Sequence, residues 1–520
     1  MGAQQVTVKR PNIVLVLADD LGYSDIGCFG GEIRTPVLDR LGREGVRCTA
    51  FYNTARCSPS RASLLTGRHP HETGIGVLTE DLSPYGAYPG SLSDRFPTIA
   101  ELLKQVGYAT CLSGKWHLSH NTAAPDGSWP TRRGFDDFFG IMSGADSYFH
   151  PQNLWRNEAR CDPPGDGFYL TDAISAHAAA FVHERASADQ PFFLYLAYSA
   201  PHWPLHAHEE DIASYAGVFE AGWDALRVER YQRMRAEGIL GDEAALSARD
   251  ATQPAWPSVS DPRWEARRMA TYAAQVEAMD RGIGAVLAAL EETGVRDDTL
   301  VLFLADNGAC AEQIPPPIAP RFFERQPSAT PDGRPMAFGN KPNVIPGPDD
   351  SFASYGRAWA NLSNTPFRFY KRWVHEGGIS TPLVAHWPQG DLATGAISAA
   401  PSQLTDLLPT LLEAAGAAAP DGPGRSMLHV LRGGAGEEHT LYFEHVGNAA
   451  VRRGEWKAVR EADQAWELYD IAHDRSELVD RADDEPALLA ALVAAWERWA
   501  DDVGVVPWER LREIVRVHGG

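Results

Sequence analysis

Four short apolar runs, none of which alternates with polar residues, divide the chain. They are Ile13–Ala18, Tyr108–Ser113, Phe192–Tyr198 and Leu300–Ala305. Uninterrupted apolar runs of this length are typical of strands buried on both faces of a parallel sheet.

Helical patterns lie between these runs. Thr98–Val106 is followed by Gly107, and Met269–Glu292 is followed closely by Gly294, so that each predicted helix has a glycine at its end. Strands that alternate with helices predict an α/β fold, with a large, mostly parallel sheet sandwiched by helices.

Two long segments interrupt this alternation. Residues 205–262 are rich in Glu, Asp, Ala and Trp and predict a helical insertion, whereas residues 311–360 are rich in Pro and Gly. Loops of this length often shape binding sites, so we expect both segments, with residues 140–165, to border a substrate pocket.

The pattern changes after about residue 430, where short strands follow one another closely. They are Leu441–Glu444, Ala449–Arg452, Trp456–Arg460 and Trp466–Tyr469, and the helical segment Pro486–Trp499 comes next. Closely spaced short strands indicate an antiparallel meander. We therefore predict a catalytic α/β domain over residues 1–430 and a smaller C-terminal α+β domain over residues 431–520.

The net charge of the chain argues against some classes of binding partner. The 520 residues contain 47 Lys and Arg against 69 Asp and Glu, which gives a net charge of −22. Such an acidic protein is a poor partner for nucleic acid. An anionic substrate would have to be held by local positive charge.

The cysteine content and the N-terminus bear on the compartment. The six cysteines do not suggest a disulfide framework. The first ten residues are polar and lack a signal-peptide pattern, and no apolar run is long enough to cross a bilayer. We expect a cytoplasmic protein without a membrane partner, although a periplasmic protein that has lost its signal would look similar. We also expect a monomer, because the insertions carry no apolar assembly stripe.

Polar residues collect where the four predicted strands end. The successive strands are followed by Asp19 and Asp20, by Lys115 and His117, by His202, and by Asp306 and Asn307. In open α/β sheets, ligands bind beyond the carboxyl ends of the strands. The agreement of four strand ends is the strongest functional signal in the pattern.

The strand ends offer oxygen ligands. These ligands would come from Asp19, Asp20, Asp306 and Asn307. Three carboxylates close together repel one another unless a cation neutralises them, and sites made only of oxygen atoms suit Ca²⁺ or Mg²⁺ better than zinc. Taken alone, each Asp pair is more commonly a turn.

Cys57 has an unusual context in the run Cys57-Ser58-Pro59-Ser60-Arg61. Ser58 as the cap and Pro59 as the first residue predict a helix start that places Cys57 beside amide groups favourable to an anion. Arg61 lies one turn further on. The alternative is an ordinary buried thiol.

Together these residues resemble the type I, formylglycine-dependent sulfatases, closest to bacterial arylsulfatases of the alkaline-phosphatase-like superfamily. Cys57 to Arg61 resembles the C-x-P-x-R signature, and Gly107 to His117 resembles the second signature of the family. Tyr370-Lys371 followed by Glu376-Gly377-Gly378 resembles the segment that carries the second active-site lysine. The resemblance spans nearly the whole chain.

The resemblance implies a mechanism. A formylglycine-generating enzyme would oxidise Cys57 to Cα-formylglycine, whose hydrate attacks the sulfur of a small-molecule sulfate ester. One Ca²⁺ would be bound by Asp19, Asp20, Asp306, Asn307 and modified Cys57. Asp306 would take a proton from the nucleophile, and Lys115, Lys371 and Arg61 would supply positive charge. His202 would protonate the leaving oxygen, and His117 would help to expel sulfate.

The sequence departs from the family pattern at two positions. Arg56 stands where a small or apolar residue is more usual, and Ser380 stands where Arg is common. His69 and His71 are interpreted as surface or structural residues. His206 and His208 form an H-x-H pattern that is weak support for zinc.

Two other functions remain open. One is hydrolysis of phosphonate monoesters or phosphodiesters by a related superfamily member, and the other is binding without catalysis. The presence of both Lys115 and Lys371 favours sulfate over phosphonate, since the resemblance implies that phosphonate hydrolases typically replace these lysines. Retention of the full catalytic set argues against a binding protein.

Overall fold

The structure is a computed structural model that describes residues 10–518 apart from 166, 189, 242 and 316–326. The four predicted strands are confirmed as β1 (Asn12–Ala18), β3 (Ala109–Gly114), β7 (Phe192–Ala197) and β8 (Thr299–Ala305). They lie side by side in the order β8-β1-β7-β3, and all three pairings are parallel. Their carboxyl ends therefore meet at one edge of the sheet.

The main sheet extends beyond these four strands to 11 strands in the described residues. β4 (Asp137–Ile141) continues the parallel part next to β3. On the other side, β11 (Ser380–His386) pairs antiparallel with both β8 and β2 (Val46–Tyr52). The predicted mostly parallel sheet is confirmed. The short strands β5 (Leu154–Arg156), β6 (Ala159–Arg160), β12 (Ile397–Ser398) and β13 (Ser402–Gln403) lie toward its edges.

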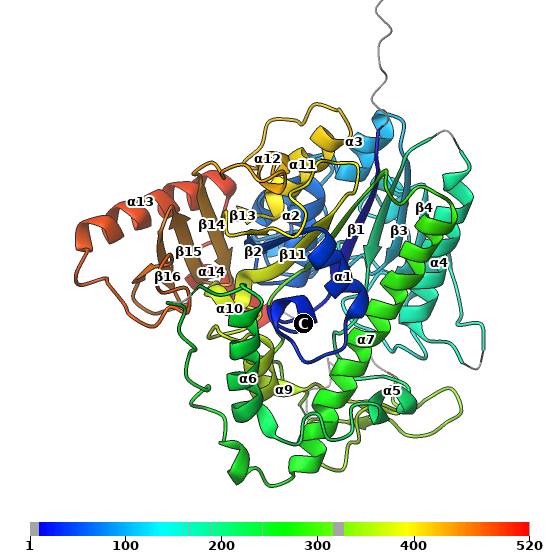
Figure 1. The fold of residues 1–520 in the computed structure, drawn as a ribbon, viewed down its shortest axis with the longest axis horizontal. Coiled ribbons are helices and arrows are strands. Elements are labelled where there is room, and N and C mark those ends of the chain that lie inside the picture. Colours follow the sequence, from blue (N-terminus) through cyan, green and yellow to red (C-terminus); the bar gives the residue numbers. More distant parts are fainter. Residues whose placement is uncertain (1–9, 166, 189, 242, 316–326, 519–520) are drawn as a thin grey trace, which may run out of the picture.

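Helices cover both faces of the main sheet (Figure 1). One face packs against α4 (Leu170–Ala186) and α7 (Pro262–Glu292) and the other against α2 (Cys57–Thr66), α3 (Ile99–Gln105) and α11 (Leu407–Ala414). Val14 and Val16 of β1 belong to the first core, whereas Ile13, Leu15 and Leu17 belong to the second. Because successive side chains point to opposite faces, a strand buried on both sides has no polar alternation.

Two helix starts differ from the sequence prediction. α2 begins at Cys57 with Arg56 as its cap, whereas the sequence predicted Ser58 as the cap. α7 begins at Pro262, ahead of the predicted Met269, because the Asp261 side chain accepts a hydrogen bond from the Trp264 amide and caps the helix.

The two predicted insertions form the region below the main sheet in Figure 1. The first contains α5 (Glu209–Ala213) and α6 (Gly222–Ala236), so its helical character is confirmed in part. The second contains the short strands β9 (Ala337–Phe338) and β10 (Ser351–Phe352) and the start of α9 (Gly356–Ser363). Residues 316–326 of this loop lie outside the described residues.

The predicted antiparallel meander is confirmed as a separate sheet of four strands in the described chain. Its strands are β14 (Thr440–His445), β15 (Asn448–Arg453), β16 (Trp456–Arg460) and β17 (Glu467–Asp470). α13 (Pro486–Val503) lies against it, and α14 (Trp508–His518) follows without having been predicted. The domain boundary at residue 430 stays a prediction.

Three further short helices in the described residues are α1 (Pro36–Glu44), α10 (Glu376–Ile379) and α12 (Leu428–Leu431). Within the described ranges, no helix combines the length and the apolar character that a membrane crossing requires.

Candidate active site

The carboxyl ends of the central strands carry a buried cluster of charge. Asp19 and Asp20 follow β1, Lys115 follows β3, and Asp306 follows β8, and each of these side chains is at most 2% exposed. Lys371 reaches the same cluster from the loop before α10, where its backbone amide donates to the Ala309 carbonyl at 3.0 Å. The structure thus brings together residues from distant parts of the sequence.

Each carboxylate has a distinct set of cationic partners. Asp19 pairs with Lys115 through Oδ2. Asp20 accepts from Lys371 Nζ, which lies 2.7 Å from Oδ1 and 2.9 Å from Oδ2. Asp306 accepts from Arg61, with Nε 3.2 Å and Nη2 2.9 Å from Oδ2.

Burial and the neighbouring charges shift the pKa values of the three carboxyl groups in different directions. Burial opposes ionisation of Asp19, but Lys115, His202 and Arg61 hold its pKa well below the ordinary value. Burial also opposes ionisation of Asp20, and Lys371 and His202 lower its pKa despite this. Burial, reinforced by the Asp19 carboxylate, raises the pKa of Asp306 to about 7.

Some oxygens of the cluster have no protein partner. Among the residues that the structure describes, Asp19 Oδ1 and Asn307 Oδ1 are buried and accept no hydrogen bond, while Asn307 Nδ2 donates to Asp20 Oδ1 at 2.6 Å. Buried polar atoms without partners are costly. Two such oxygens beside three carboxylates fit a hard, oxygen-binding cation such as Ca²⁺ or Mg²⁺.

Two histidines border the cluster. The Nδ1 atom of His202 lies 2.6 Å from the carbonyl oxygen of Trp203 and donates to it, which leaves Nε2 at 3.5 Å from Lys371 Nζ and 3.4 Å from Asp20 Oδ2. His117 has φ of 54° and a buried Nδ1 that finds no partner within the described residues. Burial lowers the pKa of both histidines, so both rings are neutral near pH 7.

Cys57 is the first residue of α2 and is only 3% exposed. Burial raises the pKa of its thiol even though Lys115 and Lys371 act in the opposite sense. An unmodified Cys57 is therefore a neutral thiol and a weak nucleophile at pH 7. Arg61, one turn along the helix, also donates to the Lys115 carbonyl at 3.0 Å and so joins α2 to the end of β3.

Sequence reasoning missed several residues that hold the site in place. The Tyr148 hydroxyl donates to the carbonyls of Ser199 at 2.8 Å and His202 at 2.9 Å. Glu312 pairs with Arg56 at 2.6 Å, directly before Cys57. The unusual Arg56 was the one hint in the sequence that such a residue exists, because an arginine next to a buried site needs an acidic partner. The sequence did not show that this partner is Glu312.

Ser380 lies away from the charged cluster described above. Its hydroxyl donates to Glu376 at 2.8 Å and accepts from Arg475 Nη2 at 3.3 Å. In this protein the guanidinium beside position 380 therefore belongs to Arg475, which is distant in the sequence.

The other histidines singled out in the sequence are structural. His206 uses both ring nitrogens, one with the Ser351 carbonyl at 2.7 Å and one with the Tyr148 amide at 3.3 Å, and so does not pair with His208 around a metal. His69 and His71 are buried, so the surface interpretation is wrong and the structural one holds.

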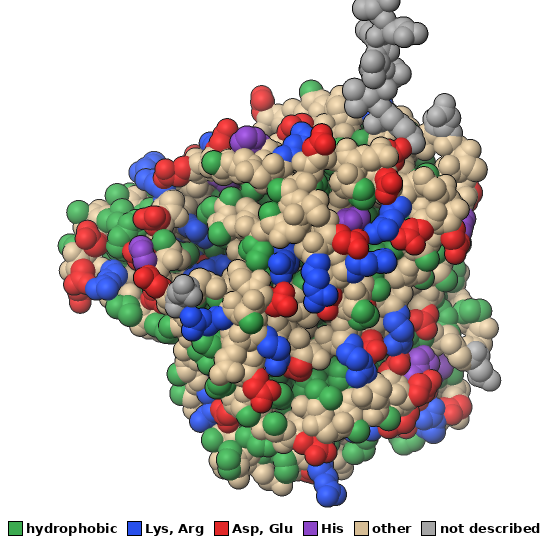
Figure 2. All heavy atoms as spheres, in the orientation of Figure 1, with side chains coloured by type: hydrophobic (Ala, Val, Ile, Leu, Met, Phe, Trp, Pro, Cys, Tyr) green, Lys and Arg blue, Asp and Glu red, His purple; other side chains and the backbone are tan. Residues whose placement is uncertain are grey.

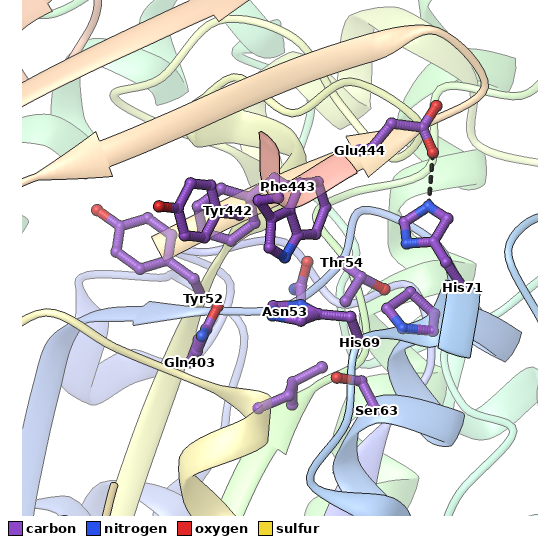
Figure 3. Close-up of a pocket in the computed structure, with 13 residues that line it drawn as sticks. Tyr52, Asn53, Thr54, Ser63, His69, His71, Gln403, Tyr442, Phe443 and Glu444 are labelled. Atoms are coloured by element: carbon purple, nitrogen blue, oxygen red, sulfur yellow. Dashed lines mark hydrogen bonds and ion pairs between the residues drawn. The ribbon is translucent and has the colours of Figure 1, made fainter. Parts of the chain in front are cut away.

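Figure 3 shows His69 and His71 lining a small cavity between α2 and the C-terminal sheet, with His71 Nε2 2.7 Å from Glu444. The cavity volume of about 10 Å³ holds about one water. A second, open hollow of about 450 Å³ is lined by Phe149, Phe168, His208 and their neighbours. Neither contains a residue of the charged cluster.

The molecular surface offers no broad attraction for anions on the face that Figure 2 shows. Acidic and basic side chains are interspersed there over α1 and α7. Binding of an anion would depend on the buried cations at the strand ends.

Comparisons with known proteins show the family of the chain. The family model described as Sulfatase matches residues 11–417, and that described as N-sulphoglucosamine sulphohydrolase, C-terminal, matches residues 367–494. An uncharacterized sulfatase of Schizosaccharomyces pombe is 32% identical over 97% of this chain and 96% of its own. The arylsulfatase of Klebsiella aerogenes is 34% identical over 80% and 89%. The crystal structure of Ps i-CgsB in complex with k-i-k-neocarrahexaose superimposes with a TM-score of 0.68 and 27% identity, covering 94% and 93%.

Proposed function

Since the chain belongs to the sulfatase family and is a sulfuric ester hydrolase, we propose that it cleaves aryl or alkyl sulfate monoesters at the strand-end cluster, with the nucleophile derived from Cys57. The observation that carries the proposal is the convergence of Lys115, Lys371 and Arg61 on three carboxylates beside Cys57. Fixed cations of this kind stabilise the charge on sulfuryl oxygens as it redistributes in the transition state.

The proposed nucleophile is Cα-formylglycine, made from Cys57 after synthesis. The high pKa of the buried thiol supports this view, because an unmodified Cys57 would remain protonated and unreactive. The position at the start of α2 supports it too, since the helix amides there favour developing negative charge. Arg61 would orient the modified residue through its contacts with Asp306 and the β3 end.

We propose that Asp19, Asp20, Asp306 and Asn307 hold one Ca²⁺ together with the modified residue. When bound, the cation would act as a Lewis acid on the sulfate and as a template for the reacting groups. The unpaired oxygens of Asp19 and Asn307 support this assignment. Asp306, whose carboxylate Arg61 fixes at 2.9 Å, would also accept the proton of the attacking hydroxyl.

The two histidines have separate proposed roles. His202 and Lys371 would protonate the leaving oxygen together. Because the Nδ1–H of neutral His202 donates to the Trp203 carbonyl, its Nε2 carries no proton of its own, and the Lys371 ammonium, 3.5 Å from Nε2, would supply the proton that is passed on. His117 would take the proton of the second hydroxyl so that sulfate is expelled and the aldehyde returns. Its unpaired Nδ1 and its lowered pKa suit a neutral general base.

The test combines mass and activity. We expect the peptide that contains Cys57 to carry the mass of the aldehyde, and we expect turnover of 4-nitrophenyl sulfate to disappear in Cys57→Ala. An unmodified thiol in fully active protein would refute the formylglycine proposal while leaving the sulfatase assignment intact.

Phosphonate monoester or phosphodiester hydrolysis is the second candidate. Lys115 and Lys371 both pair with the carboxylates of the cluster, which favours the sulfate reaction. We expect kcat/KM for an aryl sulfate to exceed that for the matched aryl phosphonate monoester. A large preference for the phosphonate would reverse the assignment.

A further inference from the structure

An ion pair stands at the partly exposed edge of the proposed active site. Arg56 Nη1 lies 2.6 Å from Glu312 Oε1, and the two side chains are 18% and 36% exposed. The second carboxylate oxygen of Glu312 accepts from Trp203 Nε1 at 3.2 Å and from Cys310 Sγ at 3.6 Å. The Glu312 backbone is fixed as well, since its carbonyl accepts from Ser354 Oγ at 2.6 Å.

The ion pair is joined to the proposed catalytic groups on two sides. Arg56 precedes Cys57 in the chain, and the Trp203 ring lies 4.5 Å from the ring of His202. The Glu312 carboxylate also acts on the cluster at a distance: after Asp20 and Cys310, it contributes to the raised pKa of Lys371 against the effect of burial.

The exposed fractions indicate which way a bound ester must extend. The side chains of Lys115, Lys371 and His202 are at most 6% exposed, so the sulfate that they would bind lies inside the protein. The leaving alcohol attached to it must extend toward the more exposed residues. Next to His202 lies the partly exposed Trp203, whose indole donates to Glu312, and Glu312 pairs with Arg56.

We infer that Glu312 is a specificity-determining residue, which neutralises Arg56 at the entrance and so favours sulfate esters whose leaving group carries no second anionic charge. The inference rests on the proposed function and narrows its substrate class. Without Glu312, the Arg56 guanidinium would be an unpaired positive charge beside the leaving group, and a carboxylate or a second sulfate there would be attracted to it.

The test compares two substrates that differ in one charge. 4-Carboxyphenyl sulfate and 4-carbamoylphenyl sulfate have the same shape, and the ratio of their kcat/KM values measures the discrimination. Relative to wild type, we expect Glu312→Gln to raise this ratio in favour of the carboxylate by about fivefold at low ionic strength. The ratio is independent of the fraction of protein in which Cys57 has been converted.

Arg56→Gln is the matched control. It leaves Glu312 as an unpaired negative charge, so the ratio should fall by about fivefold, and the double variant should return toward wild type. Added salt should shrink all of these differences. A merely structural role for the ion pair would change both substrates alike and leave the ratio unmoved.

The outcomes separate the inference from the proposed function. Opposite changes in the two single variants support the inference. If wild type hydrolyses both sulfates and the ratio stays within about twofold in every variant, or moves in one direction in both, Glu312 does not set this specificity and the sulfatase assignment stands. If wild type hydrolyses 4-nitrophenyl sulfate but neither of these two esters, the inference is wrong and the proposed function stands; if converted wild type hydrolyses no sulfate ester at all, the proposed function fails and the inference fails with it.

Discussion

Two of the buried charge clusters in the described residues combine carboxylates with lysine and arginine side chains. The first is the strand-end cluster of Asp19, Asp20 and Asp306 with Lys115, Lys371 and Arg61. The second, which we call the α10 cluster, joins Glu376 of α10 to the C-terminal segment through Lys457, Arg475 and Glu477. They differ in how far their oxygens are compensated: Glu477 Oε1 of the α10 cluster makes no hydrogen bond but lies 2.9 Å from Lys457 Nζ, whereas Asp19 Oδ1 and Asn307 Oδ1 have no partner among the described residues.

In the α10 cluster the Glu376 carboxylate is surrounded by donors. Lys457 Nζ lies 2.9 Å from it, Arg475 Nε lies 3.1 Å from it, and the Tyr52 and Ser380 hydroxyls donate to it at 3.0 and 2.8 Å. Both carboxylate oxygens of Glu376 therefore have partners. In the strand-end cluster, oxygens of Asp19 and Asn307 stay without partners in the described chain. A satisfied cluster stabilises one structure, whereas an incomplete one can take up a cation and a substrate.

The largest expected difference between the clusters is in catalysis. Asp306→Asn should lower kcat/KM for 4-nitrophenyl sulfate by more than about a thousandfold, because it removes a proposed cation ligand and the proton acceptor together. Glu376→Gln, the matched change in the α10 cluster, should lower the same kcat/KM by less than about tenfold. Equal losses in the two variants would show that the clusters do not differ in function.

For stability, in contrast, we expect a large loss when the α10 cluster is changed. Lys457→Met leaves Glu376 and Glu477 buried without their shared cation, and this should lower the free energy of unfolding by about 3–5 kcal/mol. Chemical denaturation measures the loss. Combining Lys457→Met with Glu376→Gln should recover part of the loss, because Glu376, which Arg475 alone would then compensate, no longer carries a buried negative charge. A single variant as stable as wild type would mean that the α10 cluster does not hold the C-terminal sheet in place.

Cation removal should affect only the strand-end cluster. At a concentration about a hundredfold above its dissociation constant, Ca²⁺ should stabilise the fold by about 2.7 kcal/mol, and the melting temperature in chelator should fall accordingly. Asp306→Asn should abolish most of this shift, and Glu376→Gln should keep it. A shift that survives in Asp306→Asn would place the cation elsewhere.

The smallest expected effect is the change in unfolding free energy with pH that Glu376 of the α10 cluster causes. Burial opposes ionisation of Glu376, but Lys457, Arg475 and Arg452 lower its pKa from 4.5 to about 2. A carboxyl with a lowered folded-state pKa contributes stability above the unfolded value and loses it as pH falls from about 4.5 toward 2. At pH 4 the loss is ~1 kcal/mol. The difference in unfolding free energy between wild type and Glu376→Gln should narrow by this amount between pH 7 and pH 4.

Much of the fold could be predicted because its signals are local. The runs that became β1, β3, β7 and β8 show no alternation of apolar and polar residues, which is typical of strands buried on both faces. β2 and β11 gave a weaker signal because Arg47 and Thr49 interrupt the apolar residues of β2. The start of α2 was misplaced because Arg56, rather than Ser58, occupies the cap position.

The sequence by itself determined the order of the central elements and the residues at their ends, since apolar runs and the polar residues that follow them are properties of neighbouring positions. Only the tertiary structure decided how those ends are paired. Lys371 meets Asp20, Glu312 meets Arg56, and Lys457 meets Glu376 across long stretches of chain. Which buried carboxylate is satisfied and which is left open depends on these distant contacts, and no local pattern encodes them.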